Sequence, residues 1–231
     1  MTSRMQAVVA AAGLAVSAAA ASGSATLVIT EIWAGSPSNP DHTSDWFELS
    51  NTGDMPYDLN ANPLWYDDDS ADPTKDDMLV PGGDGIINPG EAVVILVSWE
   101  DDFFDFAEAR NQFKATWGAL NTIDIGYIAG GSGLGGGGDE VWLFDGNTAG
   151  ANTVATQGYA NDDFASWIWN PETESWNDEL AEAGKFLARE SNPTGGDPLQ
   201  PAIGSPGFIP TPGTAAILGL AGIASVRRRR G

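Results

Sequence analysis

Hydrophobic and polar residues alternate along several stretches of the chain, and this pattern predicts β-strands. Residues 27–33 and 45–51 tend to place apolar side chains at every second position, which is typical of strands with one buried face. Residues 92–99 are apolar almost throughout, which favours a central strand, and residues 140–145 are rich in β-branched and aromatic side chains. Weaker strand candidates are 123–128, 153–159, 185–190 and the two arms 166–169 and 175–176 around an Asn170-Pro171 turn.

The segment 105–117 has the spacing of a helix instead. Its apolar stripe consists of Phe106, Ala109, Phe113 and Trp117. Asp105 and Glu108 suit the helix N-terminus, and Gly118 suits the position after its last turn. Clusters of Gly, Pro, Asn and Asp separate the other segments, as turns require. We therefore expect an all-β fold, a two-sheet immunoglobulin-like β-sandwich with one short inserted helix.

The first 25 residues have the pattern of a secretory signal peptide. One positive charge, Arg4, precedes an apolar run at 7–21, and small residues follow at 23–25. We expect signal peptidase to remove this signal helix, residues 1–25, so that the mature protein begins near Thr26. A retained membrane helix is the alternative, although the run is short and rich in alanine.

Residues 210–231 have the layout of a second targeting signal. A break of Pro210, Thr211, Pro212 and Gly213 precedes an apolar segment, and the chain then carries Arg227, Arg228, Arg229 and Arg230. The apolar segment 215–226 is 12 residues long, or ~18 Å as a helix, which is short for a hydrocarbon core of roughly 30 Å. Because arginines stay on the cytoplasmic side of a bilayer, we expect a hydrophobic helix that anchors the chain transiently. A disordered basic tail is the alternative.

This C-terminal layout resembles the PEP-CTERM sorting signals of exported bacterial proteins. The resemblance implies recognition by an exosortase, a membrane-embedded sorting protease. It also implies transient anchoring in the inner membrane, followed by display at the cell surface or release outside the cell. Thr211 departs from the pattern, since the family usually has Glu there.

The body between these two signals, 26–209, is strongly acidic and long enough for one domain. All 32 acidic residues lie in it, but only five of the ten basic residues do, so its formal charge is −27. Such a surface repels nucleic-acid phosphates and anionic lipids. The chain has no cysteine, so its core depends on apolar residues, among them nine tryptophans and nine phenylalanines.

Five short motifs follow one another in this body. They are Ile-Thr-Glu-Ile at 29–32, Asp-Trp-Phe-Glu-Leu-Ser-Asn at 45–51, Pro-Gly-Glu at 89–91, Gly-Gly-Asp-Glu-Val-Trp-Leu-Phe-Asp at 137–145 and Ser-Pro-Gly at 205–207. Their content and order resemble the lamin-tail domain, an immunoglobulin-like β-sandwich of nuclear lamins and exported bacterial proteins. The resemblance implies structural roles for Glu31, Trp46, Glu48, Asn51, Gly90, Glu91 and Arg189. The DNA binding sometimes ascribed to the nuclear relatives is disfavoured by the charge of the body.

Glu48 lies at an unusual place for a charged residue. The alternation of its strand puts Phe47 and Leu49 on one face, and Trp46 and Glu48 on the other. A buried carboxylate without donors is too costly, so we expect Glu48 to face water or to bond backbone amides or a cation such as Arg189. A catalytic role would need a second positioned acid or base, and the spacing along the chain singles out none.

Side chains that would support catalysis are scarce. His42 is the sole histidine and lies in a polar stretch, so neither a histidine-rich zinc site nor a catalytic triad follows from it. A glycine-rich match at 131–136 precedes a strand rather than a helix, so it predicts a flexible loop and no dinucleotide site. We therefore expect no enzymatic activity.

Calcium is the one ligand that the composition supports. Two acidic stretches, 67–77 and 83–91, offer carboxylates. The weak candidates for ligands are Asp67, Asp69, Asp72, Asp84 and Glu91. Neither stretch has the spacing of an EF-hand, so a solvated acidic loop is the simpler interpretation.

Two functions fit these observations. The first is an exported, non-catalytic protein of the cell surface or extracellular matrix, in which the sandwich makes structural or adhesive contacts with a partner that the sequence does not name. The second is a glycan-binding, or less readily glycan-cleaving, secreted sandwich. It would need exposed tryptophans that stack on sugar rings, and the candidates are Trp33, Trp46, Trp65, Trp142, Trp167, Trp169 and Trp176. Tryptophans buried between sheets favour the first function, and three coplanar, exposed ones on a sheet face favour the second.

Overall fold

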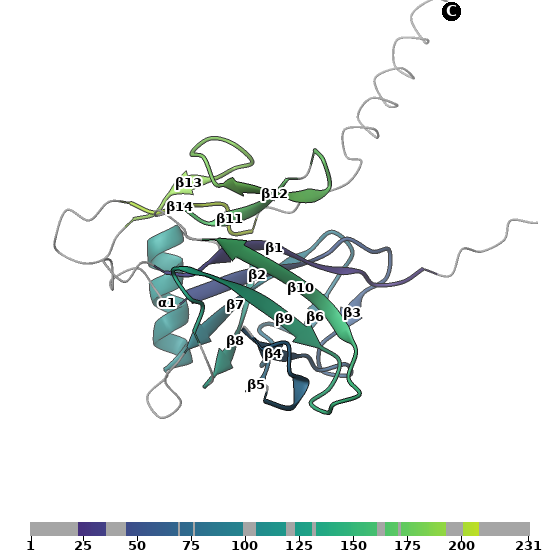
Figure 1. The fold of residues 1–231 in the computed structure, drawn as a ribbon. Coiled ribbons are helices and arrows are strands. Elements are labelled where there is room, and N and C mark those ends of the chain that lie inside the picture. Colours follow the sequence, from purple (N-terminus) through teal and green to yellow (C-terminus); the bar gives the residue numbers. More distant parts are fainter. Residues whose placement is uncertain are drawn as a thin grey trace, which may run out of the picture.

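The computed structural model describes residues 23–35, 45–68, 70–75, 77–98, 105–118, 123–130, 133–160, 165–170, 172–192 and 201–207. The protein is mostly β, with one short helix and several sheets (Figure 1). The expected N-terminal signal helix, the expected C-terminal hydrophobic helix with its arginines, and His42 lie outside the described residues.

The largest sheet has six strands in the order β12-β11-β1-β2-β7-β8. Their bounds are Leu27–Trp33 for β1, Asp45–Asn51 for β2, Ala92–Ser98 for β7, Asp124–Ala129 for β8, Trp167–Asn170 for β11 and Ser175–Leu180 for β12. Neighbouring strands are antiparallel except β7 and β8, which run parallel. The strand predictions at 27–33 and 45–51 are thereby confirmed, and so is the prediction for 92–99 as far as Ser98, because residue 99 lies outside the described residues.

A second sheet has four strands in the order β10-β9-β4-β5. Their bounds are Trp65–Asp67 for β4, Asp77–Met78 for β5, Gly138–Phe144 for β9 and Thr153–Ala160 for β10. Val80 forms an antiparallel bridge to Tyr127 of β8, with both backbone hydrogen bonds made at 2.8 and 2.9 Å. This bridge joins the edge of the second sheet to the edge of the first, so the two form a curled half-barrel.

Smaller elements complete the described part of the fold. They are the two-stranded sheets β3 (Tyr57–Asp58) with β6 (Ile86–Ile87) and β13 (Arg189–Glu190) with β14 (Ile203–Gly204), the 3-10 turn η1 (Pro73–Lys75) and the helix α1 (Phe106–Trp117). In Figure 1, β13 and β14 lie near β11 and β12, at the top of the view, while α1 runs along the side of the half-barrel.

Apolar side chains from both large sheets form one shared core. The six-stranded sheet contributes Ile29, Phe47 and Ile95, and the four-stranded sheet contributes Tyr66 and Leu143, all of them buried. Burying one such aliphatic or phenyl side chain stabilises a fold by about 1.5–3 kcal/mol. This inter-sheet core is therefore a main source of stability in a chain without disulfides.

The other face of the six-stranded sheet is covered partly by α1. Trp46 of β2 lies edge-on to Phe113 and Trp117 of the helix, with ring centroids 5.5 Å apart in both pairs. Because Trp46 faces the helix and Phe47 faces the inter-sheet core, the predicted alternation of β2 is confirmed. Strand β7 supplies side chains to both clusters, as a central strand should.

The helix begins and ends where its sequence signals predict. The Asp105 carboxylate accepts the backbone N–H of Glu108 at 3.0 Å, which satisfies one of the free donors at the N-terminus. Gly118 follows the last turn with a φ of 84°, which glycine adopts without strain. The helix prediction for 105–117 is confirmed.

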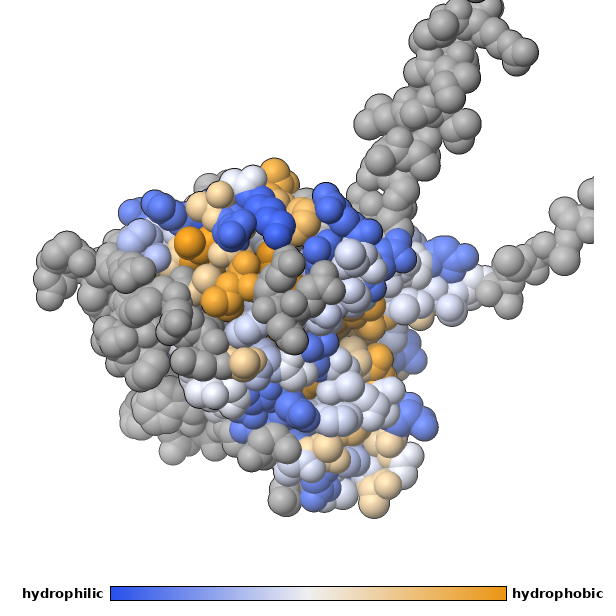
Figure 2. All heavy atoms as spheres, turned by 45° about the horizontal axis from the view of Figure 1, so that its top comes forward, coloured by the Kyte–Doolittle hydropathy of each residue, from blue (hydrophilic) through white to orange (hydrophobic). Residues whose placement is uncertain are grey.

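The strand predicted at 185–190 is wrong over most of its length. Only Arg189 and Glu190 form a strand, β13, while the preceding residues form a turn. Phe186 and Leu187 have φ values of 49° and 63°, in the left-handed region that a strand cannot use. Leu187 is 73% exposed, and apolar side chains gather over this layer of the molecule (upper part of Figure 2).

Candidate functional site

Two glutamates stand side by side inside the protein. Glu31 of β1 is the direct cross-strand partner of Glu48 of β2, and each is only 1% exposed. A bulge between Ile29 and Glu31 makes this arrangement possible. Since side chains alternate along a strand, Glu31 would otherwise share the face of Ile29 and enter the apolar inter-sheet core. The extra residue, Thr30, turns Glu31 to the face that carries Glu48.

Glu48 accepts hydrogen bonds from one hydroxyl and one backbone amide. Thr30 Oγ1 donates to Oε1 at 2.7 Å, and the Gly207 N–H donates to Oε2 at 2.5 Å. The Thr30 hydroxyl also lies 2.8 Å from Ser50 Oγ. The bulge residue and the closing Ser-Pro-Gly motif therefore meet at the same carboxyl group.

Glu31 is bonded by two serines that are far away in the sequence. Ser166 donates its hydroxyl to Oε1. Ser205 donates its backbone N–H to Oε1 at 2.6 Å and its hydroxyl to Oε2 at 3.1 Å. The pair of glutamates thus holds the segment 201–207 at two points, Ser205 and Gly207. We call this stretch the closing segment.

Both carboxyl groups are held partly in the neutral form. Burial is the main cause and raises the pKa of Glu31 from 4.5 to about 7, although hydrogen bonds from Ser166 and Ser205 and the charge of Arg189 oppose the rise. Burial, followed by the negative charge of Glu31, raises the pKa of Glu48 from 4.5 to about 8. Hydrogen bonds from Thr30 and Gly207 oppose it. Near neutral pH the pair therefore retains a proton.

The lamin-tail resemblance implies structural roles for seven residues, and the structure brings four of them to the glutamate pair or close to it. Glu31 and Glu48 are neighbours, Trp46 lies in the cluster under α1, and the charge of Arg189 acts on Glu31 from the exposed strand β13. Glu48 bonds a backbone amide, as expected, but the amide belongs to Gly207. Sequence patterns do not reveal the pairing with Glu31, because two glutamates 17 positions apart become partners only through the register of β1 and β2.

The other three motif residues form a separate junction at the ends of β2 and β7. Asn51 Nδ2 donates to the carbonyls of Met55 and Ile87 at 2.7 and 2.9 Å. The Gly90 N–H donates to the Asn51 carbonyl, and the Asn51 N–H donates to the Glu91 carbonyl. Gly90 has a φ of 74°, which suits its place in the turn before β7. This junction fixes the loops at the ends of β2 and β7.

The calcium candidates fall into two separate turns. Asp67 is buried and accepts the Ser70 hydroxyl at 2.8 Å and the Asp72 N–H at 2.9 Å. In the other turn, Asp84 accepts the Ile86 N–H and Glu91 accepts the N–H and side-chain amide of Asn88. Asp69 lies outside the described residues. Within the parts that the structure describes, no three acidic or histidine side chains gather as a metal site would require.

The tryptophans divide between core and half-buried positions. Trp33, Trp46 and Trp167 are buried. Half-buried positions are held by Trp65 and Trp142 on the four-stranded sheet and by Trp169 and Trp176 on the six-stranded sheet. Neither sheet therefore presents three exposed tryptophans among the described residues.

Chemically, the glutamate pair can store a proton and bind backbone amides, but a substrate cannot reach it. At 1% exposure each, both carboxyl groups are enclosed by β1, β2 and the closing segment. An added Cβ on Gly204 would lie 2.8 Å from the Trp117 ring and 3.0 Å from Glu31 Oε1, so the closing segment is tightly seated. The geometry favours a structural role, in which the two glutamates hold the closing segment against β1 and β2.

Comparison with known proteins adds no assignment to this geometry. The chain matches no family model, no curated protein and no solved structure. Of the helices in the described part of the chain, none combines the length and the hydropathy that a bilayer crossing requires.

Proposed function

We propose that the chain is an exported, non-catalytic protein of the cell surface or extracellular matrix. Its body is a lamin-tail-like, immunoglobulin-type β-sandwich that serves as a structural or adhesive module. Signal peptidase processes the N-terminus, and an exosortase-type protease sorts the chain through residues 210–231. The anchoring in the membrane is transient.

The burial of Glu31 and Glu48 is the observation that carries the proposal. Among the described acidic groups, these two have pKa values raised toward neutrality, which suits acid–base chemistry, yet both are enclosed and bonded by the closing segment. A catalytic pair needs access to a substrate. Because both glutamates hold the closing segment in place instead of facing a substrate, they support a structural module that acts through its surface.

The charge distribution supports export and display. The body carries a formal charge of −27, whereas the tail carries four arginines and no acidic residue. An acidic body stays soluble outside the cell and does not adhere to anionic lipid. A basic tail is retained on the cytoplasmic side. The body and the tail thus carry opposite charges. This difference suits a chain whose body is exported while its tail is held briefly at the membrane.

Fractionation of cells that carry an exosortase tests the sorting step. The variants are the full chain, a deletion of residues 227–230, and a matched control in which the four arginines become lysines. We expect the full chain and the lysine control to be processed and to reach the surface, because both keep the positive charge. The deletion should accumulate unprocessed or be lost to the medium. Unchanged processing and location of the deletion would refute the sorting proposal.

A glycan-binding module is the second candidate, and the outer face of the four-stranded sheet favours it. Trp65 pairs across the strands with Phe144, whose ring stacks on Trp142 at 6.1 Å with nearly parallel planes. Met78, opposite Trp65, is 52% exposed. Phe144 itself is buried, so the aromatic surface available here consists of the two half-buried indoles of Trp65 and Trp142, and indoles can stack on pyranose rings.

Pull-down on insoluble neutral polysaccharides distinguishes the two candidates. If this face binds glycan, Trp65→Ala and Trp142→Ala should each reduce retention severalfold, while the control Trp169→Ala on the other sheet should not. Equal retention of all three variants, or no retention of the wild type, removes the glycan candidate and leaves the export proposal untouched.

A further inference from the structure

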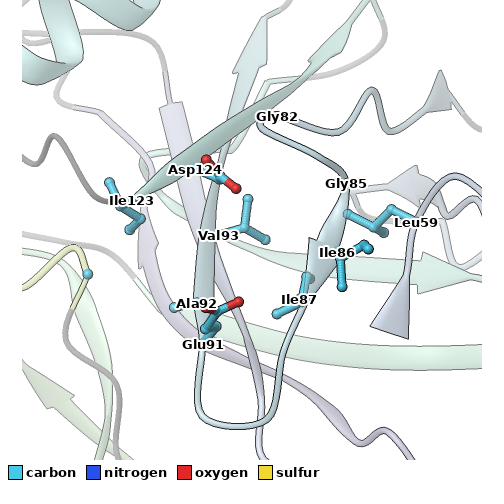
Figure 3. Close-up of a pocket in the computed structure, with 11 residues that line it drawn as sticks. Leu59, Gly82, Gly85, Ile86, Ile87, Glu91, Ala92, Val93, Ile123 and Asp124 are labelled. Carbon is cyan, nitrogen blue, oxygen red and sulfur yellow. The ribbon is translucent and has the colours of Figure 1, made fainter. Parts of the chain in front are cut away.

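A cavity of about 310 Å³ opens beside the closing segment and belongs to neither the glutamate pair nor the tryptophan surface. It is bordered by β6, by the loop before it, by the first residues of β7 and β8, and by Gly207 (Figure 3). Its volume is at the lower end of the range of small-molecule sites. It is therefore large enough for a ligand with a short apolar body.

Part of the cavity surface is apolar and consists of side chains that belong to the two hydrophobic clusters of the core. Leu59, Ile87, Val93 and Ile123 line it, and each is at most 9% exposed to solvent. In Figure 3, Val93 lies in the middle, with Ile87 on one side and Ile123 on the other. An alkyl chain placed against these side chains would lose contact with water, which favours its binding.

The loop before β6 forms one wall of the cavity, and it is closely packed in the structure without a ligand. An added Cβ on Gly82 would collide with the Ile125 carbonyl oxygen, so the loop is packed directly on the backbone of β8. Gly85 has a φ of 76°, and its added Cβ would collide with the Asn60 side-chain amide. The close contacts at both positions seat the loop against β8 and Asn60 at the side of the cavity.

The charged side chains described at the cavity are both negative. Among the described residues that line it, the charged ones are Asp124 and Glu91, and both are exposed carboxylates. Glu91 is bonded on one oxygen by Asn88. Within the described residues no donor is bonded to the Asp124 carboxylate. In Figure 3, Asp124 lies above Val93 and Glu91 lies below it.

We propose that this cavity is a binding site for an alkylammonium group. The ammonium pairs with the Asp124 carboxylate, with Glu91 adding to the negative potential, and the alkyl chain lies on Val93 and Ile87. Anionic ligands are repelled by the two carboxylates, and the described lining residues include no aromatic side chain on which a sugar ring could stack. The site does not depend on the export of the protein, so it stands apart from the proposed function.

NMR titration of the isotopically labelled full chain tests the proposal. The probes are n-hexylamine, which is an ammonium ion at neutral pH, and the matched n-hexanol and hexanoate. Amide signals of Gly82, Gly85 and Gly207 report on the cavity. Asp124→Asn removes the ion pair at nearly constant volume, and Glu182→Gln, on the exposed turn after β12, is the control with the same change in net charge.

Hexylamine should shift these glycine signals saturably, with hexanol and hexanoate binding at least about tenfold more weakly because they lack the charge-assisted contact. Asp124→Asn should weaken hexylamine binding by about two- to fivefold, and Glu182→Gln should leave it unchanged. Equal binding of hexylamine and hexanol, or an unaffected Asp124→Asn variant, would overturn the proposal.

A second arm identifies the source of the ammonium group. Nα-acetyl-lysine amide presents the same alkylammonium chain as a protein side chain does. If it shifts the same signals as hexylamine does, the site accepts lysine side chains of a partner. If only hexylamine binds, the site accepts free amines. Both results support the alkylammonium site.

Discussion

Replacing Glu48 by Gln should remove much of the pH dependence of stability that the buried pair creates. Glutamine keeps the shape of the side chain and an oxygen that accepts the Gly207 N–H, but it cannot ionise. In the folded wild type, the pKa of Glu48 is raised to about 8 from 4.5, the value of an unperturbed glutamate such as one in the unfolded chain. Between these two values the folded state binds more protons than the unfolded state does. Stability is therefore fully present below pH 4.5 and is lost as the pH rises through 8.

The size of the effect follows from the shift. A pKa unit corresponds to about 1.4 kcal/mol, so raising the pKa from 4.5 to about 8 weakens folding by about 5 kcal/mol once the pH exceeds both values. Most of this loss, on the order of 3 kcal/mol, falls between about pH 5 and pH 8. That is a large fraction of the roughly 5–15 kcal/mol by which a typical domain is stable.

Urea unfolding followed by tryptophan fluorescence at a series of pH values from about 5 to about 9 measures the effect. The wild type should lose stability across this range, Glu48→Gln should lose much less, and the double variant Glu31→Gln/Glu48→Gln should be nearly flat. Glu172→Gln, an exposed turn residue, is the control and should follow the wild type. If the wild type is equally stable at both ends of the range, or if Glu48→Gln keeps the full slope, the buried pair does not hold a proton in the folded state.

Three other substitutions test the packing around the pair and the elements that support it. Gly204→Ala places a methyl group 2.8 Å from the Trp117 ring, so we expect a loss of about 1–3 kcal/mol in urea unfolding. Asn51→Ala leaves two carbonyls without their donor and should cost about 2–4 kcal/mol by the same measurement, whereas Asn51→Asp should also be destabilising because a carboxylate cannot donate to them. Asp105→Ala removes the helix cap, and calorimetry should show a melting temperature lowered by an amount that corresponds to about 1 kcal/mol, with Asp105→Ser close to the wild type.

The elements that the sequence predicts well are those with a strong local pattern. Strands 27–33, 45–51 and 92–98 have marked apolar patterning, and α1 has a cap at Asp105 and a glycine after its last turn. The pattern does not predict strands β3 to β6, because each has only two or three residues and their pairing, such as Tyr57 with Ile87, is set by loops rather than by periodicity.

The glutamate pair lies beyond what local patterns can predict. Its position depends on a bulge at Thr30, on the register of β1 and β2, and on donors from Ser166 and Ser205, which are 135 and 174 residues away from Glu31. The sequence does carry one signal: each glutamate is flanked by apolar residues within its strand, and buried carboxylates require partners. The donors themselves could not be named, since none is close in the sequence.

Hydrogen–deuterium exchange of the closing segment tests the central claim most directly, namely that the buried glutamates fasten residues 201–207. In mildly acidic buffer, Glu48→Ala removes the acceptor of the Gly207 amide, and Asp105→Ala serves as a control that lowers stability elsewhere. We expect Glu48→Ala to speed exchange at Gly207 at least about tenfold more than at the core residue Val94, because the segment opens locally. If Gly207 and Val94 exchange faster by the same factor in both variants, the glutamate does not fasten the segment and the account is contradicted.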